Sequence, residues 1–515
     1  MSWWNLSAAS DWLESLNMLT NLQELHLSAT SLPPTDLNYL SSSNFTVLHT
    51  IDLLGNNINS AFPYWLTNIQ TLSSISLTSY GLRGSIPEAV GNLTTLEELF
   101  LSGNSLEGAI PVSVGRLCNL VILDLSSNNL FGDIDNLGNA MSSCMSELRI
   151  IKLGSNNISG SLSGWIGSFK NLISLDLSHN SLSGKLPTSL VEMKSLIFLE
   201  LGSNQLEGQI PDIPRRLEVL DLSNNFFSEP LPHSLGGQLP NCWKQNDSLF
   251  VMDFSNNNLV GEIPSSIGSL TILGFLHLNE NKMSGMLPTS LSSCKYLLLL
   301  DLGENHFGGS LPAWIGDSLQ FLIILRLRSN QFSGDIPDGL SQIQGLQVLD
   351  LADNKFSGPL PRSIGNFTME PTGENSYFDY FDSIYYNDSL YLTIKGEERM
   401  YSRILYLMKS IDLSDNELTG EIPVEVGALV ELKNLNLSRN RLSGHIPETI
   451  GQMGSLESLD LSWNQLSGVI PQSMASLHSL SHLNLSHNNL SGKVPPGSQL
   501  QTLGDQDPYI YAGNS

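Results

Sequence analysis

The chain has 515 residues, with 24 Lys and Arg against 50 Asp and Glu, and a net charge of −26. Polyanionic nucleic acid repels so acidic a protein, which excludes nucleic-acid binding as a general role. Four cysteines are too few for a disulfide scaffold, and no stretch approaches the roughly 18 apolar residues that a membrane-spanning helix needs.

The N-terminal residues do not form a signal peptide. Met1 to Trp4 contain no apolar core of the kind that a signal peptide carries, and Asn5-Leu6-Ser7 stands where the middle of a repeat would. Neither end shows the polar cap that a solenoid needs. We therefore expect the chain to be truncated at both ends relative to a longer protein.

From Leu48 onward the sequence repeats every 24 residues, with the pattern LxxLxxLxLSxNxLxGxIPxxIGxL. Clear copies begin at Leu123, Leu175 and Leu459. A fixed period in this range indicates a solenoid, in which each repeat packs on its neighbours and the array presents a long open surface. Binding is therefore the expected kind of function.

The final residue of each LxLxxN defines what we call the ladder position. We expect the two leucines of LxL to point inward from a short strand, and the Asn amide to bond backbone groups of adjacent coils. The ladder predicts 18 repeats, at Thr30, Asn56, Tyr80, Asn104, Asn128, Asn156, Asn180, Asn204, Asn225, Asn257, Asn281, Asn305, Asn330, Asn354, Asn416, Asn440, Asn464 and Asn488.

Gly-x-Ile-Pro or a close variant follows the ladder residue in most repeats, as at Gly84 to Pro87 and Gly468 to Pro471. Glycine permits the turn out of the first strand, and proline ends a short extended segment. This block resembles the plant-specific extracellular class of leucine-rich repeats. The implied fold class is an α/β solenoid, a superhelix with a parallel concave β-sheet.

No enzyme signature occurs: GxSxG, GxxxxGK[ST], HExxH and the kinase motifs are all missing. Asp recurs between the strand leucines in so many repeats, for example at Asp124 and Asp412, that we interpret it as part of the scaffold. We predict a protein that is not an enzyme and that has no cofactor and no metal site.

Two further features suit the secretory pathway. Cys118 and Cys144, 26 residues apart in successive repeats, could form a disulfide, whereas Cys242 and Cys294 are better explained as buried hydrophobic residues. The ten Asn-x-Ser/Thr sequons are candidate glycosylation sites, although some arise by chance in so Asn-rich a repeat: Asn5, Asn44, Asn92, Asn157, Asn246, Asn366, Asn387, Asn436, Asn484 and Asn489.

The ladder is interrupted once. Asn354 and Asn416 lie 62 residues apart, 38 more than one repeat. We therefore divide the chain into N-terminal repeats (1–368), an island insertion (369–402), four C-terminal repeats (403–495) and a tail toward a missing C-terminal cap (496–515). Long insertions in regular arrays are often functional, and the island is rich in tyrosine, which suits recognition. Alternatively, its aromatic residues only pack the insertion against the solenoid.

An island four repeats before the C-terminal end is typical of plant leucine-rich-repeat receptor-like proteins, and so is Tyr386 followed after eight residues by Lys395-Gly396. Asn5 to Leu13 is most similar to the receptors that detect fungal ethylene-inducing xylanase. The resemblance implies a cell-surface immune, or developmental, receptor on the extracellular face of the plasma membrane. Such receptors recognise a microbial protein or peptide and signal through a co-receptor kinase and an adaptor kinase.

Candidate binding residues lie in two groups. Lys152, His277 and Arg326 replace the usual strand Asp, and Arg328 follows Arg326. With the island residues Tyr385, Tyr386, Lys395 and Gly396, they form the predicted ligand site, in which Arg326 and Arg328 contact an acidic patch. Simple drift of surface positions is the alternative.

The resemblance also implies a co-receptor site on the last four repeats, where Asp415, Arg439, Trp463 and His487 precede the ladder Asn. The alternative is that Trp463 only packs on its strand neighbours.

Two other functions use similar repeats. One is a secreted inhibitor of a microbial cell-wall-degrading enzyme, like the plant polygalacturonase inhibitors; the island and the greater length count against it. The other is a grass-type ice-binding protein, disfavoured because the exposed strand residues here vary. Defence or development, and the ligand itself, stay open at this point.

Overall fold

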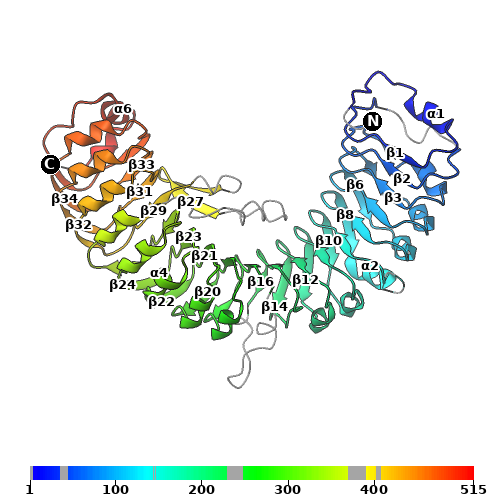
Figure 1. Cartoon of the computed structure of the whole chain (residues 1–515), viewed down its shortest axis with the longest axis horizontal. Coiled ribbons are helices and arrows are strands. Elements are labelled where there is room, and N and C mark those ends of the chain that lie inside the picture. Colours follow the sequence, from blue (N-terminus) through cyan, green and yellow to red (C-terminus); the bar gives the residue numbers. More distant parts are fainter. Residues whose placement is uncertain are drawn as a thin grey trace. The chain divides into compact units, whose positions relative to one another are not determined.

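The computed structural model describes residues 4–34, 44–142, 144, 146–228, 248–368, 390–401 and 408–514. These fall into two compact units, Met1–Asn258 and Leu259–Ser515. In each unit the strands formed by the LxL segments stack side by side along one face, which we call the concave face, and short helices lie on the opposite side (Figure 1). Each coil is named below after its ladder residue.

The described part of the first unit contains ten LxL strands, each paired in parallel with the next. They are β1 (Glu24–His26), β2 (Thr50–Asp52), β3 (Ser74–Ser76), β5 (Glu98–Phe100), β7 (Ile122–Asp124), β9 (Ile150–Lys152), β11 (Ser174–Asp176), β13 (Phe198–Glu200), β15 (Val219–Asp221) and β17 (Val251–Asp253).

The second unit contains eight such strands, so the eighteen repeats predicted from the ladder are confirmed. Strand β25 pairs directly with β29, so Val348 lies opposite Ser410 although the insertion separates them in sequence. The eight are β19 (Phe275–His277), β21 (Leu299–Asp301), β23 (Ile324–Arg326), β25 (Val348–Asp350), β29 (Ser410–Asp412), β31 (Asn434–Asn436), β33 (Ser458–Asp460) and β35 (His482–Asn484).

A second short strand follows the ladder residue in most coils and pairs in parallel with its neighbours. In the first unit these are β4 (Arg83–Gly84), β6 (Ser105–Ala109), β8 (Asn129–Asp133), β10 (Asn157–Gly160), β12 (Ser181–Lys185), β14 (Gln205–Gly208) and β16 (Phe226–Phe227). In the second they are β18 (Val260–Gly261), β20 (Lys282–Gly285), β22 (His306–Ser310), β24 (Gln331–Asp335), β26 (Lys355–Ser357), β30 (Thr419–Glu421), β32 (Arg441–Gly444), β34 (Gln465–Val469) and β36 (Asn489–Ser491).

Short helices complete the coils. Within the described residues, four are α-helices: α1 (Trp12–Asn17), α2 (Ile134–Met141), α4 (Trp314–Ser318) and α6 (Ser498–Gln506). The others are 3-10 helices: η2 (Tyr64–Asn68), η3 (Glu88–Asn92), η4 (Val112–Arg116), η5 (Gly164–Ser168), η6 (Thr188–Glu192), η7 (Ser265–Ser269), η8 (Thr289–Ser293), η9 (Asp338–Gln342), η10 (Arg362–Asn366), η12 (Val424–Ala428), η13 (Glu448–Gln452), η14 (Gln472–Ser476) and η15 (Pro508–Tyr511).

The ladder asparagines hold neighbouring coils together, as predicted. The side-chain amide of Asn128 donates to the carbonyl of Leu101 in the preceding coil (3.0 Å) and to that of Leu125 in its own (3.1 Å). Its Oδ1 accepts from the amide of Leu106 (3.0 Å). The leucines of each LxL are buried, so these bonds satisfy backbone groups that would otherwise lie unpaired in the core.

The Gly-x-Ile-Pro block also acts as expected. Gly108 has φ of +89°, a conformation that costs little only for glycine. Pro111 has extended backbone angles and directly precedes η4. Because proline fixes φ and donates no backbone hydrogen bond, the extended segment ends there and the short helix begins.

Residues 498–514, which the sequence analysis assigned to a tail, form a further coil. Asn514 takes the ladder role: its side chain donates to the carbonyls of Leu485 (2.9 Å) and Tyr511 (3.0 Å), and accepts from the amide of Leu490 (2.9 Å). Tyr509 and Tyr511 stand where the strand leucines would, and this substitution hid the repeat from a leucine-based pattern. Among the described helices, none combines the length and apolar character needed to cross a bilayer.

Candidate functional site

The repeated Asp of the concave face has a local structural role. Asp124 Oδ1 accepts from the amide (3.1 Å) and the hydroxyl (2.6 Å) of Ser126, two residues on. Asp412 makes the same two bonds with Ser414 (3.0 and 2.6 Å). Each carboxylate thus caps the end of its own strand, which explains why Asp-x-Ser recurs and why a departure from Asp is informative.

Lys152 and His277, two predicted ligand residues, both occupy this strand position. Lys152 lies in register between Asp124 and Asp176 on the neighbouring strands and is partly buried. His277 lies opposite Asp301 and is buried. Lys152 belongs to the first unit and His277 to the second.

Arg326 is enclosed by carboxylates. Its Nη1 lies 3.2 Å from Asp301 Oδ1, its Nη2 lies 3.0 Å from Glu304 Oε1, and its Nε lies 3.7 Å from Asp350 Oδ2. The residue is only 1% exposed. A buried positive charge that is paired with three carboxylates has a structural role. Direct contact of Arg326 with an acidic ligand patch therefore does not fit this geometry.

Arg328 is the more accessible of the two arginines. Its Nη1 lies 3.7 Å from Asp412 Oδ2, and 23% of its side chain is exposed. Asp412 lies opposite Asp350 across the β25–β29 pair. Burial, and for Asp350 also the neighbouring Asp412, raises the pKa of both carboxyl groups. Arg326 and Arg328 thus supply the positive charge that this buried pair needs where the sheet closes across the insertion.

Glu200 is a departure from Asp that the sequence analysis missed. It lies in register between Asp176 and Asp221 in the first unit. Burial, assisted by these two carboxylates, raises the pKa of Glu200 to about 7. The signal was present in the sequence, because Glu200 is the one longer acid in a run of strand aspartates.

The island contributes a two-stranded antiparallel hairpin, β27 (Leu390–Ile394) and β28 (Glu397–Tyr401). Lys395 and Gly396 form its turn, with φ of +57° and +74°. Positive φ at both central residues is the signature of a type I′ turn, which matches the twist of paired strands. The Lys-Gly motif therefore has a structural role here. The predicted ligand residues Tyr385 and Tyr386 lie outside the described residues.

The predicted co-receptor residues form a continuous row, which we call the edge stripe: Asp415, Arg439, Trp463 and His487. Arg439 Nε lies 3.8 Å from Asp415 Oδ2, and the Arg439 guanidinium carbon lies 5.8 Å from the centre of the Trp463 ring. The Trp463 ring in turn stacks on His487.

Trp463 is both packed and exposed. Its ring stacks on His487 and 51% of the residue is exposed, so it packs on a neighbour and also faces solvent, and its part in co-receptor docking stays a prediction. Its φ is +54°, and the other three stripe residues share this left-handed conformation, so the positive φ is a property of the position before the ladder residue and not of Trp463 alone.

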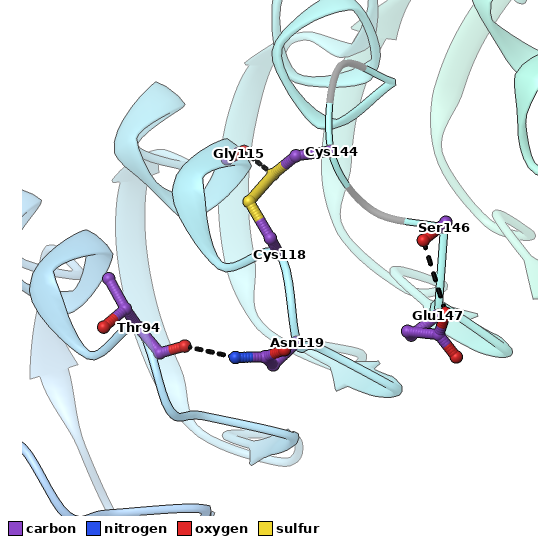
Figure 2. The surroundings of a disulfide bond; sticks show 7 residues. All are labelled: Thr94, Gly115, Cys118, Asn119, Cys144, Ser146 and Glu147. Atoms are coloured by element: carbon purple, nitrogen blue, oxygen red, sulfur yellow. Dashed lines mark hydrogen bonds between the residues drawn. A yellow bond between two sulfur atoms is a disulfide. The ribbon is translucent and has the colours of Figure 1, made fainter.

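The cysteines expected to pair do lie in a disulfide (Figure 2). Cys118 and Cys144 have Cα atoms 5.0 Å apart and join successive coils. Next to the bridge, the side chain of Asn119 donates to the Thr94 carbonyl (2.8 Å), so a hydrogen bond extends the link to the preceding coil. Cys294 is a buried free thiol, as expected, and Cys242 lies outside the described residues.

The sequons differ in their surroundings. Asn5, Asn44, Asn92, Asn157, Asn366 and Asn489 are exposed. Asn436 and Asn484 lie on the concave face, where their side chains are engaged. Asn484 donates to Asp460 (3.3 Å) and accepts from the Ser486 amide (3.2 Å). Asn246 and Asn387 lie outside the described residues.

Family comparisons agree with this architecture. Leucine rich repeat models match residues 146–206 and 430–490 and also 216–238, 248–270, 321–343, 345–367 and 408–429. A model of two such repeats matches residues 94–139. Receptor-like protein 43 of Arabidopsis thaliana is 42% identical over 59 residues, which are 12% of this chain and 8% of that protein. The match to Receptor-like protein 34 covers 6% of its length.

Solved structures extend the similarity to nearly the whole chain. The Arabidopsis receptor kinase HAESA, in complex with the peptide hormone IDA and the co-receptor SERK1, is 32% identical with a TM-score of 0.72. That match covers 97% of this chain and 79% of HAESA. The ectodomain of GASSHO1/SCHENGEN3, in complex with CASPARIAN STRIP INTEGRITY FACTOR 2, is 28% identical with a TM-score of 0.57, covering 98% and 68%. The chain therefore belongs to the family of plant leucine-rich-repeat receptor-like proteins.

Proposed function

We propose that the chain is the ligand-binding region of a cell-surface immune, or developmental, receptor-like protein. It recognises a microbial protein or peptide outside the plasma membrane and recruits a receptor-kinase partner, and it has no enzymatic activity of its own. One observation carries the proposal. The four coils that follow the insertion bear the island hairpin on their concave face and the edge stripe at the ends of their strands.

The edge stripe has the composition of a protein-binding hot spot. Trp and Arg are the residue types most enriched in such spots, and a half-exposed Trp463 held between Arg439 and His487 is pre-positioned for a partner. The related receptor kinase HAESA is known in complex with a peptide hormone and the co-receptor SERK1. We assign the edge stripe to a co-receptor of that kind.

Ligand recognition is assigned to the concave face and the island. The accessible candidates are Lys152 in the first unit and Arg328, Lys395 and Gly396 in the second. Arg328, beside Asp412, keeps 23% of its side chain exposed, whereas the Arg326 side chain is only 2% exposed. Of the two arginines in the ligand site, Arg328 is therefore the one that we expect to contact an acidic patch on the ligand.

A recruitment assay tests this function. The purified chain is immobilised and exposed to the SERK1 ectodomain, alone and with a purified fungal ethylene-inducing xylanase. The proposal expects capture of SERK1 that increases when the xylanase is present. Capture that is equally absent with and without xylanase would contradict the assignment of the co-receptor.

The second candidate function is a secreted inhibitor of a microbial cell-wall-degrading enzyme. The open concave face favours it, since that face offers a large surface to a folded enzyme. The same purified components separate the two functions. An inhibitor lowers the activity of the xylanase and recruits no SERK1, whereas a receptor recruits SERK1 whether or not the xylanase loses activity.

A further inference from the structure

The hairpin β27–β28 lies along the concave face of the coils that follow the insertion. Asn434 in the Asn440 coil donates a hydrogen bond to the Thr393 carbonyl of β27 (3.4 Å). Lys395 Nζ, in the turn, lies 3.3 Å from Glu457 Oε2 in the Asn464 coil. A Cβ atom added to Gly396 would lie 3.6 Å from the His482 ring in the Asn488 coil. The hairpin thus reaches across three successive coils.

The base and the tip of the hairpin are held by different forces. Leu390 and Leu392, toward the base, are both buried, so burial of apolar surface fixes this end. At the tip, the Lys395 and Glu457 side chains are 44% and 41% exposed. Exposed ion pairs of this kind are weak and are screened by salt.

Glu457 is well placed to hold the tip. Lys433 Nζ also lies 4.0 Å from Glu457 Oε1, so this carboxylate is shared by one lysine of the hairpin and one of the solenoid. The type I′ turn fixes the backbone of Lys395 and directs its side chain to the coil below. Gly396 needs its positive φ and meets no close obstacle, so the turn itself is unstrained.

We propose that the β27–β28 hairpin is a strap that covers the concave face of the last coils and opens at its tip, with the Lys395–Glu457 ion pair as its latch. The buried leucines act as the hinge end. When closed, the strap covers the strand-start residues Asn434 and His482; when open, it presents them to solvent. Access to this end of the concave face therefore depends on the latch. This inference concerns the chain alone and does not require the proposed receptor function.

Hydrogen–deuterium exchange on the intact chain tests the strap. The backbone amides of residues 390–401 are compared in wild type, Lys395→Glu, Glu457→Lys and the double charge swap. Each single variant places like charges at the latch. We expect exchange at the hairpin tip to rise about three- to fivefold, the range that an exposed ion pair can supply, and to return toward wild type in the double swap.

Arg399→Glu is the matched control, because Arg399 pairs with Glu397 inside the hairpin. This substitution also replaces a positive side chain with a negative one, but it leaves Lys395 and Glu457 unchanged. High salt should raise tip exchange in wild type and change it less in Lys395→Glu. Protection of the Leu435 and Leu459 amides reports whether each variant keeps its solenoid. The proposed latch would be overturned if exchange at the hairpin tip were equal in Lys395→Glu and Arg399→Glu. It would also be overturned if the double charge swap did not bring tip exchange back toward wild type.

Discussion

The indole ring of Trp463 stacks on the imidazole ring of His487, with centroids 3.9 Å apart and planes inclined by 22°. Both residues directly precede a ladder asparagine and have positive φ, so adjacent coils present them in the same orientation. The Arg439 guanidinium lies near the Trp463 ring as well. Repetition of the coil thus builds a rigid aromatic and cationic row from residues 24 positions apart.

Trp463→Ala should weaken docking of the SERK1 ectodomain by about 2 kcal/mol, because it removes a half-exposed aromatic anchor from the edge stripe. Interferometry with the immobilised chain would measure the dissociation constant, which should rise roughly thirtyfold. Tyr296→Ala is the control, since Tyr296 is also a stacked, half-exposed aromatic residue but lies off the stripe. Equal losses in the two variants would remove the edge stripe from the docking site.

Arg326→Ala should destabilise the fold. It leaves Asp301 and Asp350 buried without their counter-charge, and breaking a buried ion pair costs about 3–5 kcal/mol. Chemical denaturation would report the loss. Arg441→Ala removes an exposed ion pair with Glu417 and should change the unfolding free energy by less than about 1 kcal/mol. A ligand-binding role for Arg326 would instead predict normal stability with weakened ligand capture.

The arginines show what the sequence could and could not predict. The LxLxxN register placed Arg326 correctly on the concave face, because side-chain direction follows from the period of the repeat. Its burial depends on how the coils around the insertion pack, and no local pattern records that. Similarly, the spacing placed Cys118 and Cys144 in adjacent coils, whereas the role of Lys395-Gly396 as a hairpin turn emerged only with the pairing of β27 and β28.

The stability of the chain should fall between pH 4.5 and pH 7. Glu200 has its pKa raised from 4.5 to about 7, so the folded state holds a proton that the unfolded state releases earlier. The contribution of protonated Glu200 to the free energy of unfolding is fully present below pH 4.5 and is lost as the pH rises through 7. Its size is on the order of 3 kcal/mol. Asp350 and Asp412 act in the same direction.

Glu200→Gln should flatten this dependence, because a neutral amide removes the titration and its repulsion with Asp176 and Asp221. Thermal unfolding at several pH values would compare it with Glu207→Gln, an exposed acid in the same coil. A pH profile of Glu200→Gln that matches wild type would show that Glu200 does not titrate in this range.

The Cys118–Cys144 disulfide should be recovered from secreted protein as one linked peptide in non-reducing mass spectrometry. Replacing both cysteines with Ala should lower the unfolding free energy by roughly 3–4 kcal/mol on the chain-entropy model for a loop of this size. Cys294→Ala, at a buried free thiol, is the control for lost packing. Two free thiols at positions 118 and 144 in secreted protein would contradict the bridge.

Glycan occupancy should separate the sequons by their place in the coil. Asn92 and Asn157 are exposed and should carry glycans. Asn436 and Asn484 should stay bare in folded, secreted protein, since a glycan attached there would sit on the concave face. Asn436 donates to Asp412 (3.2 Å) and accepts from the Ser438 amide (3.1 Å), and Asn484 has equivalent bonds. A chain modified at either site would lose part of this network and fold poorly.

Glycopeptide mass spectrometry after enzymatic deglycosylation in heavy-oxygen water would give the occupancy of each site. Asn436→Asp and Asn484→Asp remove each sequon and introduce the residue that nine of the eighteen strands carry at this position. The new carboxylate still accepts from the Ser amide two residues on, so both variants should be secreted. Occupancy at Asn484 equal to that at Asn92 would show that the concave face of the last coils tolerates a glycan, and it would leave this face unsuited to close contact with a protein ligand.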